Sequence, residues 1–386
     1  MTAIVKTREF VAPARTRAGV VVPGLGHLLV GEWIIGGGLL ALDALWLLAA
    51  VRGLPRLGTL FGGQELLHPL LAVLSFVGLT VGLGWAGYRR AYPRVLTEQQ
   101  YNSNGQIFLR TLGRHRTGML GLFGVIFLVS MTLLTPMLAP FDPDQVDVGA
   151  PNLAPGGAYW FGTDLYGRDV FSRLLYGGRI SLSIGLVAVG IAAFLGTSLG
   201  AIAGYLGGLV DRVITFVTDG LLSMPRLVLL LTIVGLFRVQ GAAGIFLIVA
   251  ILGLTAWMGI ARIVRGEVLS LKQREFVQAA RALGFSQWRI LFGHLIPNAL
   301  APVIVFCSLA MGTTMLAEAG LSFLGLGVPP PTSTWGVMVD DGRDYLRTAP
   351  WVSIFPGLAI MVAVLSFNLL GDGLRDATDP KLRGTD

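Results

Sequence analysis

The sequence predicts an all-α protein that crosses a membrane several times. Hydrophobic residues make up 54% of the 386 residues and charged residues only 13%, whereas soluble domains carry roughly 25% charged residues. Several apolar stretches approach the ~20 residues that a helix needs to cross a bilayer. One polar stretch, residues 274–298, stands between two of these apolar runs. Together these observations favour a polytopic membrane protein with one element at the membrane surface.

The hydrophobic pattern predicts about eight transmembrane spans in two parts of the chain. Residues 1–106 form an N-terminal extension with two spans and a basic linker, and residues 107–386 form a membrane domain with six. The positive-inside rule predicts a cytoplasmic location for both termini and for the polar stretch, because basic residues concentrate there. The expected spans are residues 20–50, 67–87, 117–139, 181–205, 213–237, 243–263, 299–324 and 351–371.

The polar stretch is expected to form two short helices joined by a turn. Residues 275–283 contain strong helix formers, and Gly284 is suited to end that helix. Ser286 is placed to cap the second helix, and Pro297 marks the end of that helix or a kink. A compact helix-turn-helix of this kind at a membrane surface predicts a docking element.

The connection at residues 140–180 lies on the opposite side and is longer than topology requires. Asp164 is expected to cap a short helix there, and Asp169 with Arg173 forms an i,i+4 pair on it. The apolar face of this helix predicts that it lies along the membrane interface before the fourth span begins.

A second long connection on that side covers residues 325–350. Its prolines exclude a regular helix at the start, and Asp340 and Asp341 follow in an acidic segment beside two arginines. Structured loops of this size predict a partner or a lid on this side of the membrane.

The sequence contains no recognisable catalytic, metal-binding or nucleotide-binding motif. None of the three lysines follows a glycine, which excludes a phosphate-binding loop of the Gly-Lys-Ser/Thr kind. The four histidines are dispersed without ligand spacing. The basic residues lie between spans, as membrane orientation requires, so nucleic acid is not an expected partner. We therefore predict no catalytic residue, no metal site and no cofactor in this chain.

The pentapeptide GTSLG at residues 196–200 formally matches the nucleophile elbow of hydrolases. It lies in the middle of an apolar span among other small residues, and Gly204 continues the spacing. A nucleophile elbow requires a strand-to-helix turn, which this context does not offer. The pattern instead predicts close approach of a second helix.

Four blocks of the sequence resemble one known family. EFVQAARALG at residues 275–284, followed by HLIPN at 294–298, resembles the EAA loop of ATP-binding-cassette (ABC) importer permeases. Three more blocks are similar to the second permease subunit of dipeptide and oligopeptide importers: FGTDLYGRDVFSRLLYGGRISLSIG, AEAGLSFLGLGVPPPTSTWGVMV and FPGLAIMVAVLSFNLLGDGLRDATDP. The resemblance runs in order from about residue 107 to the C-terminus. It implies a type I ABC importer permease core of six helices, to which the N-terminal pair of spans is an addition.

The resemblance also implies a function and a set of partners. The chain would form half of a pathway for di- or oligopeptides in the plasma membrane of a prokaryote. Its implied partners are a second homologous permease, two cytoplasmic ATPase subunits that bind ATP and magnesium, an extracytoplasmic binding protein and membrane lipid. The coupling loop, about residues 265–298, would contact an ATPase through Glu275, Ala279, Ala280, Arg281, Gly284 and Ser286. Contacts with the binding protein are expected at Asp164, Arg168, Asp169, Trp335, Asp340 and Asp341.

Polar residues within the spans are candidates for the solute pathway. Intramembrane polar groups usually mark a pathway or a contact between helices. Arg226 follows the helix-kinking Pro225, and its guanidinium either meets a peptide carboxylate or pairs with Asp219. The expected pathway residues are Asp219, Arg226, Glu318 and Asn368.

Three other interpretations are open at this point. The same class of transporter also carries nickel chelates, glutathione and other small solutes. A secondary transporter would show inverted repeats and ligands for a coupling ion, and no such repeat is found. A membrane scaffold would not need an inner docking helix together with a proline-rich outer loop.

Overall fold

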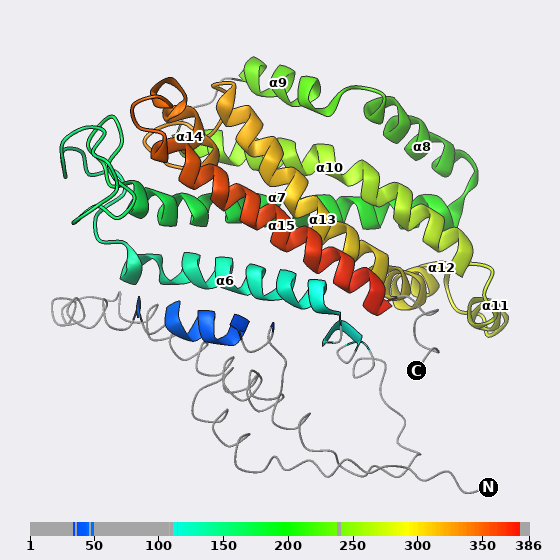
Figure 1. Ribbon diagram of the computed structural model, residues 1–386. Coiled ribbons are helices and arrows are strands. Elements are labelled where there is room, and N and C mark those ends of the chain that lie inside the picture. Colours follow the sequence, from blue (N-terminus) through cyan, green and yellow to red (C-terminus); the bar gives the residue numbers. More distant parts are fainter. Residues whose placement is uncertain are drawn as a thin grey trace, which may run out of the picture. The chain divides into compact units, whose positions relative to one another are not determined.

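The computed structural model describes residues 34, 37–45, 48–49, 108, 111–113, 115–237 and 241–378. The chain divides into two compact units, Met1–Gly105 and Gln106–Asp386. In the first unit, residues 37–45 are helical. The expected span at 67–87 lies outside the described residues, as does most of the expected span at 20–50. The second unit contains the other described residues (Figure 1).

Long apolar helices form the second unit. Five of them meet the length and hydropathy needed to cross a membrane, and a sixth span exists if α8 and α9, which are bent by 87°, count as one. The described residues contain isolated bridges but no strand. These findings confirm the all-α polytopic fold. The five are α6 (Arg116–Leu138), α7 (Val170–Leu206), α10 (Gly241–Leu271), α13 (Ile296–Phe323) and α15 (Trp351–Thr378); the bent pair is α8 (Gly208–Leu222) and α9 (Arg226–Phe237).

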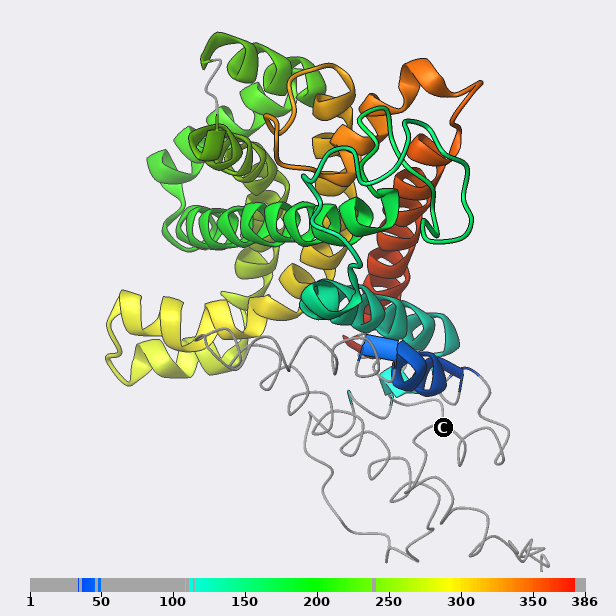
Figure 2. The same ribbon diagram turned by 90° about the vertical axis from the view of Figure 1, so that its left-hand side faces the viewer.

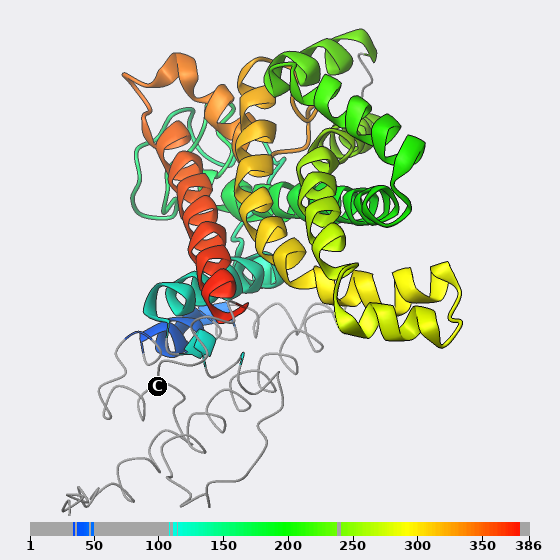
Figure 3. The same ribbon diagram turned by 90° about the vertical axis from the view of Figure 1, so that its right-hand side faces the viewer.

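The helices are arranged around α7, which packs most extensively against α10. Helix α15 lies between α6 and α13 (Figure 3). Two short helices, α11 (Glu275–Ala282) and α12 (Gln287–Ile290), project together from one end of the bundle, seen in yellow in Figure 2. We call this the α11 end. Helix α14 (Trp335–Asp341) and the loop before α7 lie at the opposite end, the α14 end (Figure 1).

Helix α7 is longer than the sequence indicated. The expected interfacial helix and the expected span at 181–205 form one continuous helix of 37 residues, about 55 Å at 1.5 Å per residue. This exceeds the ~30 Å hydrocarbon core. The prediction of a separate interfacial helix is therefore wrong. No proline or cap interrupts the segment, and packing against neighbouring helices supports it along its length.

Glycines allow α7 and α10 to approach closely. A Cβ atom placed on Gly200 would lie 2.4 Å from the carbonyl oxygen of Ala261, and one on Gly196 would lie 2.6 Å from Cβ of Ile260. At Gly204 the corresponding distance to the carbonyl oxygen of Arg265 is 2.8 Å. No side chain fits at these separations. The glycine spacing thus serves helix packing, as the sequence predicted.

Replacing Gly200 with leucine is expected to destabilise the bundle by about 1–3 kcal/mol or more, because overpacking forces α7 and α10 apart. Gly190 is the matched control, since it lies on the same helix with no atom within 4 Å of its Cβ position. Thermal unfolding of the purified variants measures the difference. Equal losses for Gly200→Leu and Gly190→Leu would show that close approach does not matter.

The expected fifth span at residues 213–237 is broken in the structure. Helix α8 ends at Leu222, and α9 begins at Arg226 in a new direction. Pro225 precedes α9 and has no N–H to continue the hydrogen-bond ladder of α8. The apolar run therefore predicted a span, but it did not predict that the helix axis changes direction at the proline.

Candidate functional site

The α11 end carries the helix-turn-helix that the sequence predicts. Gly284 follows α11 with φ of +77°, a left-handed conformation that glycine adopts without a steric cost. Its N–H donates to the Arg281 carbonyl (2.9 Å), and the Phe285 N–H donates to the Ala280 carbonyl (3.1 Å). Ser286 then caps α12 by accepting from the Arg289 N–H at 3.4 Å. A single π-helical turn, Leu291–Leu295, joins α12 to α13.

One face of this element packs on the ends of α7 and α10. Val277 and Ala280 of α11 belong to the same buried cluster as Val264 and Val268 of α10 and Tyr205 of α7. The α12 side adds three further residues to that cluster, Ile290, Leu291 and Leu295. The helix pair is thus attached to both long helices, so a displacement of the pair is transmitted to them.

Cationic side chains strengthen this attachment at Tyr205. The Lys272 ammonium donates to the Tyr205 carbonyl oxygen at 2.7 Å. The Arg281 guanidinium lies 5.5 Å from the centroid of the Tyr205 ring, within the range of a cation–π interaction. Arg281, predicted as an ATPase contact, therefore also holds α11 against α7.

The opposite face of the element exposes large apolar side chains. Leu283 is 75% exposed, and the rings of Trp288 and Phe292 stack with centroids 6.0 Å apart. Phe276 is also exposed. Exposed apolar side chains are a common feature of protein contact surfaces. We call Phe276, Leu283, Trp288 and Phe292 the apolar docking face. Sequence reasoning missed it, although these residues alternate with the buried ones at helical spacing.

The coupling residues predicted from the sequence fall into two groups. Glu275, Ala279, Arg281, Gly284 and Ser286 are exposed on the projecting pair. Ala280 is only 6% exposed and contributes to the internal cluster. Ala280 therefore positions the element within its own chain, and its contact with an ATPase stays a prediction.

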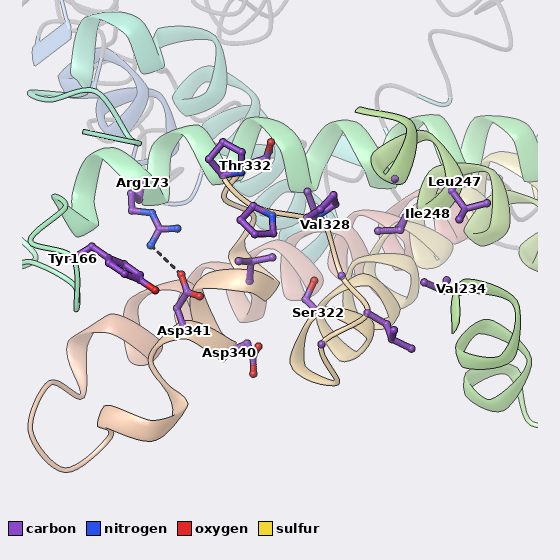
Figure 4. A pocket seen from close by; sticks show the side chains of 18 of the residues that line it. Tyr166, Arg173, Val234, Leu247, Ile248, Ser322, Val328, Thr332, Asp340 and Asp341 are labelled. Atoms are coloured by element: carbon purple, nitrogen blue, oxygen red, sulfur yellow. Dashed lines mark hydrogen bonds and ion pairs between the residues drawn. The ribbon is translucent and has the colours of Figure 1, made fainter. Parts of the chain in front are cut away.

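Four charged side chains form one ion-pair cluster at the α14 end. Asp164 Oδ2 lies 2.7 Å from Arg173 Nη1 and 2.7 Å from Arg168 Nε. Arg173 Nη1 also lies 3.1 Å from Asp341 Oδ2 on α14, the contact drawn in Figure 4. Asp164 and Arg173 are each only 2% exposed. The cluster joins the loop before α7, the first turn of α7 and the end of α14.

The cluster replaces the ion pair that the sequence predicted. Asp169 does not pair with Arg173, because its carboxylate caps α7 and accepts from the N–H of Ser172 at 2.8 Å and its hydroxyl at 2.7 Å. Asp164 does not cap a helix either; it accepts from the N–H groups of Tyr166 and Arg168 in a turn. Burial raises the pKa of the Asp169 carboxyl, while the hydrogen bonds from Ser172 oppose that rise.

Trp335 is a core residue of the α14 end. Its indole N–H donates to the Leu174 carbonyl at 2.9 Å, and its backbone N–H donates to Ser181 Oγ at 3.1 Å. Like Asp164 and Asp169, it is buried. These three side chains are therefore packed inside this chain, and their contact with a binding protein stays a prediction.

The other three residues of that prediction line a cavity of about 640 Å³. Asp340 and Asp341 lie on the same side of the cavity as Arg173, away from the apolar residues of α9 and α10 (Figure 4). Residues of the loop 325–332 also line the cavity. Desolvation raises the pKa of the Asp340 carboxyl, and the neighbouring Arg343 opposes this rise. A partly exposed charged edge beside an apolar hollow is suited to receive a group from another molecule.

Glu318 holds α13 and α14 together. Its Oε1 accepts from the hydroxyls of Ser322 at 3.0 Å and Thr334 at 2.8 Å. Thr334 in turn caps α14 through the N–H of Val337. Because Glu318 is buried and hydrogen-bonded within the chain, we leave it out of the solute pathway proposed below.

The predicted pair between Asp219 and Arg226 is not formed. Asp219 Oδ1 lies 2.6 Å from Arg262 Nη2 on α10. Arg226 has Nε and Nη2 buried without a hydrogen-bond partner. Asn368 of α15 is half-buried. Its side chain lies against α13, because a Cβ atom placed on Gly312 would be 3.3 Å from the Asn368 Oδ1 atom. Of the expected pathway residues, Arg226 therefore has buried donors without a hydrogen-bond partner.

These features define a class of protein. Within the described residues, no group of His, Cys, Asp and Glu has the arrangement of a metal site. The parts that stand out are long membrane helices, one broken span, a projecting helix pair and a cavity at the opposite end. These parts place the chain among the polytopic membrane proteins, with a projecting element at one end and a cavity at the other.

Comparisons with known proteins identify the family. The binding-protein-dependent transport system inner membrane component family matches residues 196–384, and the N-terminal membrane domain of oligopeptide transport permease C matches residues 103–155. The chain is 42% identical over 279 residues to a glutathione transport system permease protein of Pectobacterium atrosepticum, covering 72% of this chain and 91% of the relative. It is 39% identical over 276 residues to a dipeptide transport system permease protein of Alkalihalophilus pseudofirmus, covering 71% and 89%.

The chain therefore belongs to the binding-protein-dependent transport system inner membrane components, the permease subunits of ABC importers. This confirms the family resemblance found in the sequence. It also confirms a multi-pass membrane protein that acts in a complex with other subunits.

Proposed function

We propose that this permease forms half of an import pathway for short peptides. Relatives at about 40% identity carry names for dipeptide and for glutathione transport, and glutathione is itself a tripeptide derivative. The observation that carries the coupling role is the helix pair α11–α12, which is attached to α7 and α10 on one face and exposes apolar side chains on the other.

The proposed assembly contains four other kinds of component. A second homologous permease completes the pathway, two ATPase subunits supply ATP and magnesium chemistry, and a binding protein delivers solute from outside. Membrane lipid surrounds the helices. In this arrangement the α11 end and both termini face the cytoplasm of a prokaryotic cell, and the α14 end faces the binding protein.

Coupling follows from rigidity. Closure of the ATPases displaces the apolar docking face, and the internal cluster around Val277 transmits the displacement to α7 and α10. The cavity edge at Arg168, Asp340 and Asp341 is the proposed contact with the binding protein. Arg226, with its unused donors, is the proposed contact with a peptide carboxylate in the pathway.

The assembly is tested through the apolar docking face. We expect the double variant Trp288→Ala, Phe292→Ala to lose the ATPase subunits on detergent purification and to lose about tenfold or more of its peptide uptake, because exposed aromatic anchors dominate interface energies. The matched control is Leu346→Ala, since Leu346 is an equally exposed apolar residue at the α14 end.

Retention of both ATPases by the double variant would contradict the docking assignment. The solute is tested separately, by uptake of labelled dipeptides, glutathione and a nickel chelate into cells with and without the chain. Chain-dependent uptake of the nickel chelate alone would replace the peptide proposal with the alternative cargo.

A further inference from the structure

Helix α8 is bounded by a break at each end. At its start, Gly207 and Gly208 have φ of +67° and +59°, and no atom lies within 4 Å of either Cβ position. Two consecutive glycines in this region make a joint that other residues rarely adopt. At its end, the chain turns by 87° before α9, at Pro225. Both ends therefore have the geometry of a hinge.

Little core packing holds α8 in place. Among its residues, all of which the structure describes, only Thr218 is buried. Phe216 is 80% exposed, and Leu209 and Val213 are exposed as well. Helices α7 and α10 beneath it interlock through glycines, as described above. Within this chain, α8 is therefore lightly packed on a tightly packed pair of helices.

Two ion pairs connect α8 to that base. Asp211 binds Arg265 through both oxygens, at 2.5 Å to Nε and 2.7 Å to Nη2. Asp219, two turns further along α8, binds Arg262 at 2.6 Å. Both carboxylates belong to α8 and both arginines to α10. All four side chains are partly or largely exposed in this chain, so neither pair is enclosed in a packed core.

A cavity of about 250 Å³ lies between α7, α8 and α10. Its lining includes Ala203 of α7, Thr215 and Thr218 of α8 and Ala261 of α10, together with three members of the ion pairs. Ala203 has no exposed surface. Helix α8 lies over the buried Ala203, and the cavity is open beside Asp219 and Arg262, whose side chains are 55% and 61% exposed.

We infer that α8 is a hinged strap, which the pairs Asp211–Arg265 and Asp219–Arg262 hold closed over α7 and α10. Parting of the pairs lets α8 swing about Gly207–Gly208 and Pro225 and opens the cavity above Ala203. The motion of α8 is inferred from geometry alone. Its role as a gate of the transport path rests on the proposed function.

The strap is tested by thiol labelling of the full-length chain in membrane vesicles of both orientations. The chain has one cysteine, Cys307, so Cys307→Ser provides the background. Ala203→Cys then reports the space beneath α8 to a membrane-impermeant maleimide. Ala363→Cys is the matched control, because Ala363 also has no exposed surface and lies on α15, in a buried cluster that does not include Ala203.

Removing the latch should expose the reporter thiol. We expect Asp211→Asn with Asp219→Asn to raise the labelling rate of Ala203→Cys about tenfold, since neutral amides keep the size of the carboxylates but lose the charge attraction. Labelling of Ala363→Cys should not change. The single variant Asp219→Arg should also raise the labelling rate of Ala203→Cys. Adding Arg262→Asp, which re-forms the pair with the charges exchanged, should return that rate to its original value.

Two results would overturn the inference. An unchanged rate at Ala203→Cys would show that the pairs do not hold α8 closed. Increased labelling at both reporter positions would show that the pairs stabilise the whole bundle and not one strap. Because no solute enters this experiment, its outcome is independent of whether the chain transports peptides, which the uptake assays decide.

Discussion

Replacing Ala280 with arginine is expected to reduce uptake about 100-fold while the subunit still inserts into the membrane. Ala280 lies in the cluster that joins α11 to α7 and α10. A buried charge without a partner costs several kcal/mol, so α11 leaves its place. Loss of about 2.8 kcal/mol of coupling corresponds to the 100-fold effect, at about 1.4 kcal/mol for each factor of ten. Labelled-peptide uptake and membrane content of the subunit are the two measurements.

The matched control for this variant is Gln273→Arg. Gln273 is exposed just before α11, so the same charge enters the same segment without disturbing the cluster. We expect uptake to stay within about threefold of the original, as for surface substitutions in general. Normal solute-stimulated ATP turnover in Ala280→Arg would exclude the coupling role of α11.

Replacing Arg173 with alanine is expected to destabilise the α14 end by about 3–5 kcal/mol. Arg173 is buried between Asp164 and Asp341, and removal of one partner from a buried ion pair leaves the other charge uncompensated. Asp164 would then have Arg168 as its one remaining cationic partner among the described residues. Denaturant unfolding of the purified subunit, and proteolysis of the loop before α7, measure the loss.

Arg343→Ala is the control for Arg173. Arg343 is half-exposed on the same side of the protein, and its nearest carboxylate oxygens lie 3.6 Å away. A surface pair of this kind contributes about 0–1 kcal/mol. Similar losses for the two variants would mean that the buried cluster is not what holds α14 to α7.

Local signals in the sequence were sufficient for the element at the α11 end. Gly284 ends one helix and Ser286 begins the next because each acts on backbone groups within a few residues. The close helix contact at Gly196 and Gly200 was also predictable, since small residues at that spacing have few other uses within a span.

The α14 end was not predictable in the same way. The hydrogen bond between Arg173 and Asp341 joins residues 168 positions apart, and nothing near either residue indicates the other. Sequence proximity instead favoured Asp169 as the partner of Arg173, an i,i+4 pairing that the capping of α7 by Asp169 excludes. The same holds for Asp219, which binds Arg262 and not the nearer Arg226.

The sequence alone determined the membrane class, the helical composition of the core, the family and the helix-turn-helix with its caps. These depend on hydrophobic periodicity and on backbone interactions over a few residues, which any short window records. Tertiary structure alone decided which charges pair, which aromatic residues are buried and that α8 lies as a hinged segment over α7 and α10. Those outcomes depend on contacts between distant parts of the chain, where burial and geometry select one partner among several.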